Sequence, residues 1–535
     1  MNRIILIVVY LFLYACANVG SPSGGPRDET PPVLDTLRST KNFQTNFQKQ
    51  RITLVFDEFI DLKDVFNQVV VSPPLAKRPI VTKKKKTIQF DFDKDEVLRS
   101  EATYTINFGE AVRDYNEGNV TPDLRFVFST GDFIDSLEVS GKIVDALTGE
   151  PSEGVLLMLY DNLSDTVVRT ERPFYFAKTE ENGQFTIGNV KSDTFKVFAL
   201  FDSNLNYRYD QESELIGFPD GNIYLSGDSN IILPTISLFH EKPPLKIISK
   251  NPHPGLVKLT FNQIPHDINF KLEDDFEDIS YEYDLDTVNV WYDWTAEKEW
   301  ELFVNKDTLF FDTIAIKAAN KETFLNKQKL KLALGRKNKT IKFNPTKAIS
   351  INLNHPLASV DTSKIFFLED SSFTQVIPKV SFDQRELKLN YRWKEDSIYQ
   401  LQILPGGVSD IYGLSNVDTI MQQYKAALRK DFGNIALTIK GLDSLKSYVV
   451  QLFFKNNSKL VKEIPIKDLK EFKQSFNAIN PGVYYVRIIT DHNKNERWDS
   501  GNYDDKTQPE PIFIVTLEEL RANWDVEEEI TLLIE

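Results

Sequence analysis

The sequence contains one cysteine and five histidines in 535 residues. A single thiol excludes an intramolecular disulfide and any zinc or iron–sulfur site built from several cysteines, and the histidines lie far apart in the chain. Cations are also in the minority, since 63 lysines and arginines face 78 aspartates and glutamates, for a net charge of −15. Nucleic-acid binding depends on clustered cations, so this balance argues against a nucleic acid as partner.

Common catalytic signatures are missing as well. The chain has no Gly-x-Ser-x-Gly motif, no His-Glu-x-x-His motif and no glycine-rich phosphate loop. We therefore expect a protein that is not an enzyme. Hydrophobic residues make up 41% and aromatic residues 12% of the chain, which is enough to form folded cores. At roughly 100 to 200 residues per domain, the length predicts about three to five domains.

Long apolar runs are absent except at the start of the sequence. Arg3 precedes an apolar run from Ile4 to Leu13, which is followed by Tyr14, Ala15 and Cys16. A permanent membrane helix needs about 20 apolar residues, so this shorter run is typical of a secretory signal.

The residues 13–16 (LYAC) resemble a bacterial lipobox, whose cysteine is acylated and becomes the first residue of the mature protein. We predict a lipoprotein signal peptide over residues 1–15 and lipidation of Cys16, with the acyl chains as the membrane anchor. An ordinary signal peptide with an incidental cysteine is the alternative. Residues 16–31 are rich in Gly, Pro and Ser and are expected to act as a tether.

From residue 32 onward, short runs of β-branched and aromatic residues alternate with turn residues. Residues 51–56 (RITLVF) and 104–108 (YTINF) are two such runs. Alternation at period two with frequent turn signals predicts an all-β chain of tandem β-sandwiches. Helical periodicity is expected only at residues 466–475 and 517–524.

Internal repeats divide the chain into modules. Residues 195–210 align without a gap to residues 484–499 at a shift of 289, and residues 104–118 align more weakly to 399–413. The predicted order is therefore A-B-C-A′-B′, in which module C has no partner. The predicted bounds are 32–132 for A, 136–240 for B, 244–338 for C, 339–427 for A′ and 431–535 for B′.

Three stretches carry a resemblance to known families. Through residues 53–58 (TLVFDE) and 128–131 (FSTG), module A resembles the SbsA-type bacterial Ig-like domain. Module B, through 139–145 (VSGKIVD) and 182–185 (NGQF), resembles the prealbumin-like or carboxypeptidase-regulatory-like β-sandwich. The whole chain, including 16–28 (CANVGSPSGGPRD), is similar to the Ig-like-domain lipoproteins of Bacteroidota, which implies an outer-membrane lipoprotein without catalytic activity.

Two loops rich in Asp and Asn are the sharpest candidate sites. Positions 1, 3, 5, 7 and 9 of these loops are Asp202, Asn204, Asn206, Arg208 and Asp210 in module B, and Asp491, Asn493, Asn495, Arg497 and Asp499 in module B′. This is the spacing of the early ligands of a calcium loop, in which position 7 contributes its backbone carbonyl.

Other features of the loops oppose calcium. Position 6 is Tyr207 or Glu496 instead of Gly, and position 12 has no carboxylate. Loops whose Asp and Asn side chains bind their own backbone are the alternative. Calcium is therefore a candidate cofactor that we expect to bind weakly, if at all.

Two further clusters suggest contact surfaces. Trp291 and Trp294 in module C are candidates for a glycan-binding platform, with core packing as the alternative. Lys83 to Lys86 are expected at a solvated hairpin turn, with contact to acidic lipid or lipopolysaccharide phosphate as the alternative.

Together these features predict a non-enzymatic, outer-membrane-anchored lipoprotein that acts as a structural or accessory interaction subunit. A barrel-assembly or lipoprotein-export complex is its most specific setting, and a surface glycan-binding lipoprotein is the alternative. Expected partners are the membrane through the lipid anchor, and an outer-membrane barrel or other lipoproteins. The cell surface is favoured over the periplasmic face, although residues 17–27 lack the acidic cluster that surface lipoproteins of this group carry.

Overall fold

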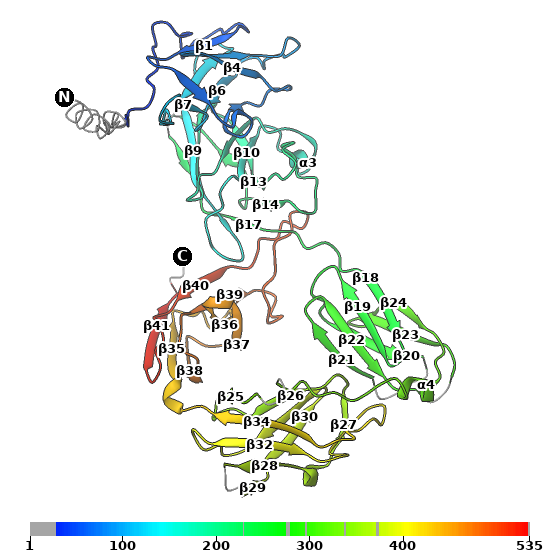
Figure 1. The fold of residues 1–535 in the computed structure, drawn as a ribbon. Helices are drawn as coiled ribbons and strands as arrows, with labels where there is room; N and C mark the ends of the chain where they lie inside the picture. Colours follow the sequence, from blue (N-terminus) through cyan, green and yellow to red (C-terminus); the bar gives the residue numbers. More distant parts are fainter. Residues whose placement is uncertain are drawn as a thin grey trace, which may run out of the picture. The chain divides into compact units, whose positions relative to one another are not determined.

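The computed structural model describes residues 28–122, 124–227, 229–273, 279–294, 297–335, 339–370 and 374–532. Within these ranges the fold is built from strands, and the α-helices α2 (Val65–Gln68), α3 (Val167–Thr170) and α4 (Lys321–Leu325) are single turns (Figure 1). The all-β prediction is confirmed. The predicted signal peptide, Cys16 and most of the predicted tether lie outside the described residues.

No helix in the described ranges combines the length and the apolar character that crossing a membrane would require. The chain forms two compact units. Unit 1 comprises Met1–Asp145 and Glu150–His240, and unit 2 comprises Ala146–Gly149 and Glu241–Glu535.

The first half of unit 1 consists of short antiparallel sheets. Their strand orders are β1 (Ile52–Val55), β5 (Thr87–Asp91), β4 (Ile80–Lys84); β3 (Val70–Ser72), β6 (Thr103–Asn107), β8 (Arg125–Ser129); and β2 (Ile60–Leu62), β7 (Val112–Asp114). In β1, Ile52 and Leu54 are buried while the residues between them are partly exposed, as period-two alternation predicts. The lysine run lies at the turn between β4 and β5, where Lys85 has a φ of 57°.

The second half of unit 1 contains two larger sheets. Their strand orders are β11 (Tyr175–Lys178), β10 (Leu156–Tyr160), β13 (Thr194–Phe201), β14 (Leu215–Gly217), with β15 (Ile223–Tyr224) also on β13; and β12 (Gln184–Val190), β9 (Leu137–Asp145), β16 (Ile231–Ile232), with β17 (Ile236–Leu238) also on β9.

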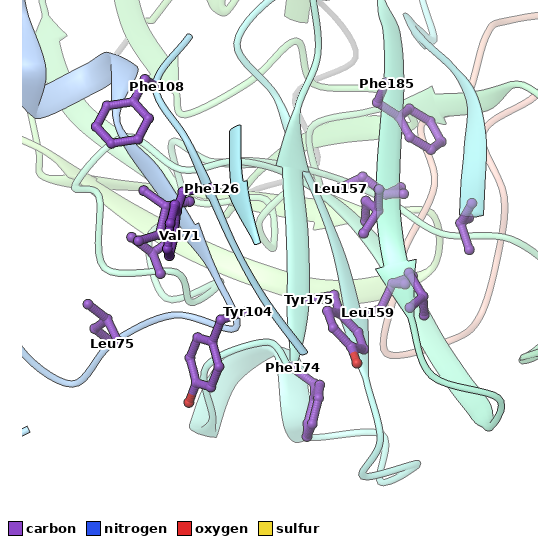
Figure 2. Close-up of a cluster of buried hydrophobic side chains, with 14 of the residues drawn as sticks. Val71, Leu75, Tyr104, Phe108, Phe126, Leu157, Leu159, Phe174, Tyr175 and Phe185 are labelled. Atoms are coloured by element: carbon purple, nitrogen blue, oxygen red, sulfur yellow. The ribbon is translucent and has the colours of Figure 1, made fainter. Parts of the chain in front are cut away.

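A single hydrophobic core runs through both halves of unit 1. It joins side chains from 47–137 with side chains from 139–238, and Figure 2 shows part of it, with Val71 and Tyr104 from one half and Leu157 and Tyr175 from the other. Hydrogen bonds cross between the halves as well. The Phe176 backbone N–H donates to the Ser72 hydroxyl at 3.1 Å. The two halves are therefore packed as one body.

Unit 2 contains three groups of sheets. The first has the orders β18 (Ile247–His253), β19 (Leu256–Phe261), β22 (Thr287–Tyr292), β21 (Ile279–Asp284); and β20 (Ile268–Leu272), β23 (Trp300–Lys306), β24 (Leu309–Ile316). The second has β25 (Ile341–Phe343), β34 (Ile420–Ala426), β32 (Ile398–Ile403), β28 (Ile365–Glu369), β29 (Thr374–Val376); β26 (Ile349–Asn352), β31 (Glu386–Asn390), β30 (Lys379–Asp383); and β27 (Leu357–Val360), β33 (Val408–Asp410). The third has β38 (Glu471–Ile479), β35 (Gly433–Lys440), β41 (Asp525–Thr531); and β37 (Lys459–Ile466), β36 (Ser447–Phe454), β39 (Tyr484–Asp491), β40 (Ile512–Thr516).

Each of these groups has its own hydrophobic core, in contrast to unit 1. The first and second groups touch through Tyr412, which belongs to the second group by sequence but lies in the core of the first. Its hydroxyl donates to the Gly255 carbonyl at 2.6 Å. Nearby, the Arg385 guanidinium pairs with the Glu282 carboxylate, with Nε 2.9 Å from Oε2. These contacts fasten the two groups together.

The helical prediction for 466–475 and 517–524 is wrong. Glu471–Ile479 is strand β38, and residues 517–524 form no helix. Phe472 and Phe476, both in the core, are four residues apart, a spacing that suits one face of a helix and also one face of a strand. Leu517 and Leu520 reach the same core from an irregular segment, in which Leu520 forms an isolated bridge to Gly482.

Candidate functional site: the two Asp–Asn loops

The two Asp–Asn loops follow the equivalent strands β13 and β39 and share an unusual backbone. Position 4 is left-handed in both, with φ of 60° at Leu205 and 63° at Lys494. Position 6 is also left-handed, with φ of 63° at Tyr207 and 65° at Glu496. A calcium loop uses glycine at position 6 to reach this conformation. The absence of glycine therefore has not changed the path of the chain.

The first aspartate of each loop binds the loop backbone. The Asp202 carboxylate accepts the N–H of Asn206 at 3.2 Å and of Tyr207 at 2.7 Å. In the second loop, Asp491 accepts the equivalent two N–H groups at 3.1 and 2.9 Å. These are the contacts of an Asx turn, in which the carboxylate replaces a backbone acceptor.

The aspartate at position 9 is held by the two asparagines. The Asn204 and Asn206 amide nitrogens donate to the Asp210 carboxylate at 3.0 and 2.7 Å. In the second loop, the amide nitrogen of Asn493 donates to Asp499 at 2.7 Å, and that of Asn495 donates to the same oxygen.

The orientation of these amides follows from their other bonds. The Asn204 amide oxygen accepts the Asn206 N–H at 3.1 Å, and the Asn206 amide oxygen accepts the Arg208 N–H at 2.7 Å. In the second loop, Asn495 accepts the Arg497 N–H in the same way, at 3.0 Å. The amides therefore turn their nitrogens toward the carboxylate, whereas calcium takes oxygen ligands.

A glutamate that the repeat comparison did not single out closes each loop. Glu214, which is 0% exposed, accepts the N–H groups of Asp210 at 3.0 Å and Gln211 at 3.1 Å. Glu510 accepts the N–H groups of Asp499 at 3.0 Å and His492 at 2.7 Å. The glutamates follow the first aspartate of their loops by 12 and 19 residues, so no common spacing marked them in the sequence.

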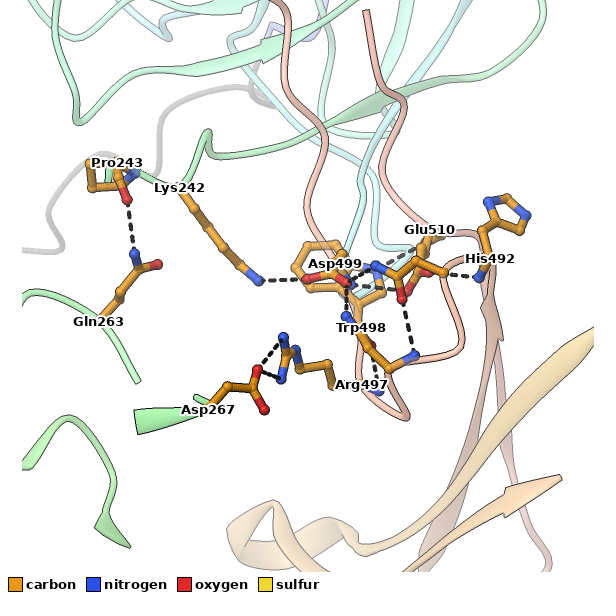
Figure 3. A network of polar contacts seen from close by, with 11 residues as sticks. Lys242, Pro243, Gln263, Asp267, His492, Arg497, Trp498, Asp499 and Glu510 are labelled. Carbon is orange, nitrogen blue, oxygen red and sulfur yellow. Dashed lines mark hydrogen bonds and ion pairs between the residues drawn. The ribbon is translucent and has the colours of Figure 1, made fainter. Parts of the chain in front are cut away.

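The second loop carries shifted carboxylates (Figure 3). Burial is the largest influence on Asp499 and raises its pKa, but the Asn493 and Asn495 hydrogen bonds with the charge of Lys242 and Arg497 bring the pKa below its ordinary value. Burial raises the pKa of Glu510, and repulsion from the neighbouring aspartates adds to the rise despite the N–H bonds it accepts.

This second loop also contacts the first group of sheets in unit 2. The Arg497 guanidinium lies 3.3 Å from the Asp267 carboxylate, and the Lys242 amine lies 3.4 Å from the Asp499 carboxylate (Figure 3). Among the described residues, no group of three or more His, Cys, Asp or Glu side chains is placed to hold a metal ion. The hydrogen bonds of both loops serve their own folding, and calcium binding stays a prediction.

The proposed tryptophan platform is not present as a surface. Trp291 is 6% and Trp294 is 3% exposed, so neither ring offers a face to a sugar. Their strand β22 lies between β19 and β21, where packing covers both sides. The Trp294 indole N–H donates to the Ala319 carbonyl at 2.9 Å, and its ring packs against Phe324. Core packing, the alternative weighed from the sequence, describes both rings.

A buried histidine and aspartate pair in unit 2 also invites attention as chemistry. His355 Nδ1 lies 2.7 Å from Asp410 Oδ2, and both side chains are buried. The other Asp410 oxygen accepts the N–H groups of Tyr412 at 3.0 Å and Leu414 at 2.8 Å. The second ring nitrogen of His355 contacts the Asn354 amide. No hydroxyl or thiol of the described residues bonds to this imidazole, so the pair organises a turn.

Comparison with known proteins assigns one part of the chain to a family. Residues 28–130 match the model of the bacterial Ig-like domain. A search of curated proteins finds no match to the chain.

Three solved structures illustrate the similarity to other β-rich proteins. The Bacillus anthracis TIE protein shows 8% identity over 99% of this chain and 79% of its own, with a TM-score of 0.14. The SGBP-B protein of a Bacteroides ovatus mixed-linkage glucan utilization locus, in complex with a mixed-linkage heptasaccharide, shows 8% identity over 73% and 94%, with a TM-score of 0.15. A DUF3823 family protein from Bacteroides uniformis shows 9% identity over 54% and 97%, with a TM-score of 0.13. Values this low carry no argument about function.

Proposed function

We propose that this protein is an outer-membrane lipoprotein, anchored through acylated Cys16, that works as a non-enzymatic structural or accessory interaction subunit. The observation that carries the proposal is the use of its buried polar groups. In both Asp–Asn loops and in the His355–Asp410 pair, carboxylate oxygens accept backbone N–H groups of turns. Groups used in this way hold the architecture, and the surfaces of the modules are then left to make contacts.

The module order A-B-C-A′-B′ is part of the proposal. Beyond the loops, the Tyr104 hydroxyl accepts the Arg99 N–H at 2.8 Å, and the Tyr399 hydroxyl accepts the Lys394 N–H at 2.8 Å. In both cases the tyrosine bonds to the residue five positions earlier. Such matching internal contacts support a duplicated framework whose copies keep their turns.

The sequence resemblance supports a setting in the outer membrane of Bacteroidota. Within that setting, a barrel-assembly or lipoprotein-export complex suits a protein that is anchored at one end and offers several modules for contact. The structure gives no support to the alternative of glycan binding through Trp291 and Trp294, because both rings are buried.

The test uses Cys16→Ala beside the unchanged protein, each with a carboxyl-terminal tag. The unchanged protein should carry acyl chains by mass spectrometry, sediment with membranes after a high-salt wash and copurify with an outer-membrane barrel protein in mild detergent. The variant should leave the membrane, since the anchor is its attachment. Retention of Cys16→Ala in washed membranes, or migration of the unchanged protein as a lone monomer, would contradict the proposal.

A further inference from the structure

One corner of module A gathers exposed aromatic rings and lysines. Phe59 is 53% and Tyr115 is 66% exposed, and the Tyr115 N–H donates to the Phe59 carbonyl at 3.0 Å, which places the two residues side by side. The Lys86 amine lies 5.7 Å from the centre of the Phe59 ring, and the Lys83 amine lies 5.6 Å from that of Tyr115. We name Phe59, Tyr115 and Lys83 to Lys86 the lysine–aromatic corner.

The described chain enters the protein at this corner. The Asn119 amide donates to the Asp28 carbonyl at 2.9 Å, and the Val33 N–H donates to the Asp57 carboxylate at 2.9 Å. Asn119 and Asp57 belong to the same two loops as Tyr115 and Phe59. Twelve residues separate Asp28 from Cys16, and a chain of that length spans at most about 40 Å.

We propose that the lysine–aromatic corner contacts the phospholipid headgroup layer of the membrane that holds acylated Cys16. The inference rests on the lipid anchor proposed above. Aromatic rings with polar edges favour the membrane–water interface, and lysines are attracted to anionic headgroups. The corner combines both groups at the point where the chain leads to the anchor.

The charges around the corner decide which lysines are available. Lys83 forms an ion pair with Asp61, and the Lys86 amine donates to the Asp57 carbonyl. Lys84 and Lys85, at the tip of the β4–β5 hairpin, are exposed and form no ion pair with the described residues. These two lysines are the cations that can approach lipid phosphates.

Acidic groups also face this region. The Asp114 carboxylate accepts the N–H groups of Glu117, Gly118 and Asn119, which balances its charge within the turn. Glu58 is less well balanced, because burial and then repulsion from its acidic neighbours, Asp114 first, raise its pKa. The chain as a whole has a net charge of −15, so contact must be local to the hairpin tip and the rings.

The anchor makes a weak contact sufficient. A short link between a lipid chain and a binding surface turns the second binding event into an intramolecular one, with an effective concentration in the millimolar range. A corner that binds headgroups poorly in free solution would therefore occupy them in the anchored protein. The contact would orient unit 1 on the bilayer.

The experiment places an environment-sensitive dye at the corner of the full-length acylated protein. Acylation consumes the Cys16 thiol, so a cysteine introduced elsewhere is the single reactive thiol. Tyr115→Cys reports on the corner, and Tyr224→Cys is the matched control, because Tyr224 is also a 66% exposed tyrosine of unit 1. Both proteins are labelled with a nitrobenzoxadiazole dye and reconstituted in vesicles of phosphatidylethanolamine and phosphatidylglycerol.

We expect the dye at position 115 to brighten and to be quenched by spin-labelled lipid, while the dye at position 224 behaves as in water. A second variant, Lys84→Gln with Lys85→Gln, should lower partitioning onto anionic vesicles by about fivefold per lysine removed. Its effect should disappear in phosphatidylcholine vesicles, which separates net negative charge from phosphate alone.

Equal, water-like signals at both positions in a protein shown by mass to be acylated would overturn the inference and leave the lipoprotein proposal standing. A missing acyl mass, or labelling of Cys16 itself, would instead refute the lipoprotein proposal. Shielding of position 115 in native membranes but not in pure lipid vesicles would assign the corner to a protein partner and overturn the lipid contact.

Discussion

Replacing Glu510 with alanine should open the second Asp–Asn loop and leave the first in place. Its carboxylate accepts the N–H groups of His492 and Asp499, at 2.7 and 3.0 Å, and the variant leaves both donors without that acceptor. An unsatisfied buried donor costs about 1–3 kcal/mol. Since burial already raises the pKa of Glu510, part of this loss is offset by removing an unfavourably placed charge. A net cost of about 2 kcal/mol follows, which makes loop opening about 30-fold more frequent.

Hydrogen exchange of the full-length protein, read by mass spectrometry of peptides, measures this opening directly. Peptides that cover 491–499 should exchange faster in Glu510→Ala, whereas peptides that cover 202–210 should not change. Glu214→Ala is the mirror control, because Glu214 closes the first loop with the same pair of backbone bonds and should reverse the pattern. Unchanged exchange at 491–499 in folded Glu510→Ala would refute the role assigned to this carboxylate.

Four further outcomes are expected. The calcium hypothesis predicts weak heats of binding in calorimetry that Asp491→Ala removes, and the absence of heat would leave only the Asx-turn role. Leu157→Ala, in the shared core, should cost about 2–5 kcal/mol and lower the urea midpoint of both halves of unit 1 together; a shift in one half alone would contradict the shared core. Tyr412→Phe should cost about 1 kcal/mol and speed exchange around Gly255, since it removes their hydrogen bond. Because the folded pKa of Asp499 is lowered, its contribution to stability is present above about pH 3.9 and is lost as the pH falls through the folded pKa, so Asp499→Asn should reduce the difference in melting temperature between pH 6 and pH 3.

Local pattern was a sufficient guide to the strands and to the two loops. Alternation along residues 104–108 predicted a strand, and β6 occupies Thr103–Asn107. The repeated spacing from Asp202 and Asp491 predicted turns closed by side chains, because an Asx turn is a contact between near neighbours in sequence.

Contacts between distant residues were beyond reach. Glu214 and Glu510 arrive at equivalent places from different distances along the chain, so their shared role shows only in three dimensions. Burial of Trp291 depends on β19 and β21 flanking its strand, which the local sequence does not reveal. The two wrong helices had the same cause, since a four-residue apolar spacing fits a helix or a strand until the partner strand is known.

The core of unit 1 sets what evolution can copy. Because both halves fill a single core, a gene fragment that ends between them would encode two incomplete pieces, and recombination would preserve function only when it moves the pair as one cassette. In unit 2 each group of sheets closes its own core, so a break between groups leaves complete pieces that can be exchanged singly. A duplication of the joined pair followed by separation of its copy would account for both arrangements, and it would free the later modules to diverge independently.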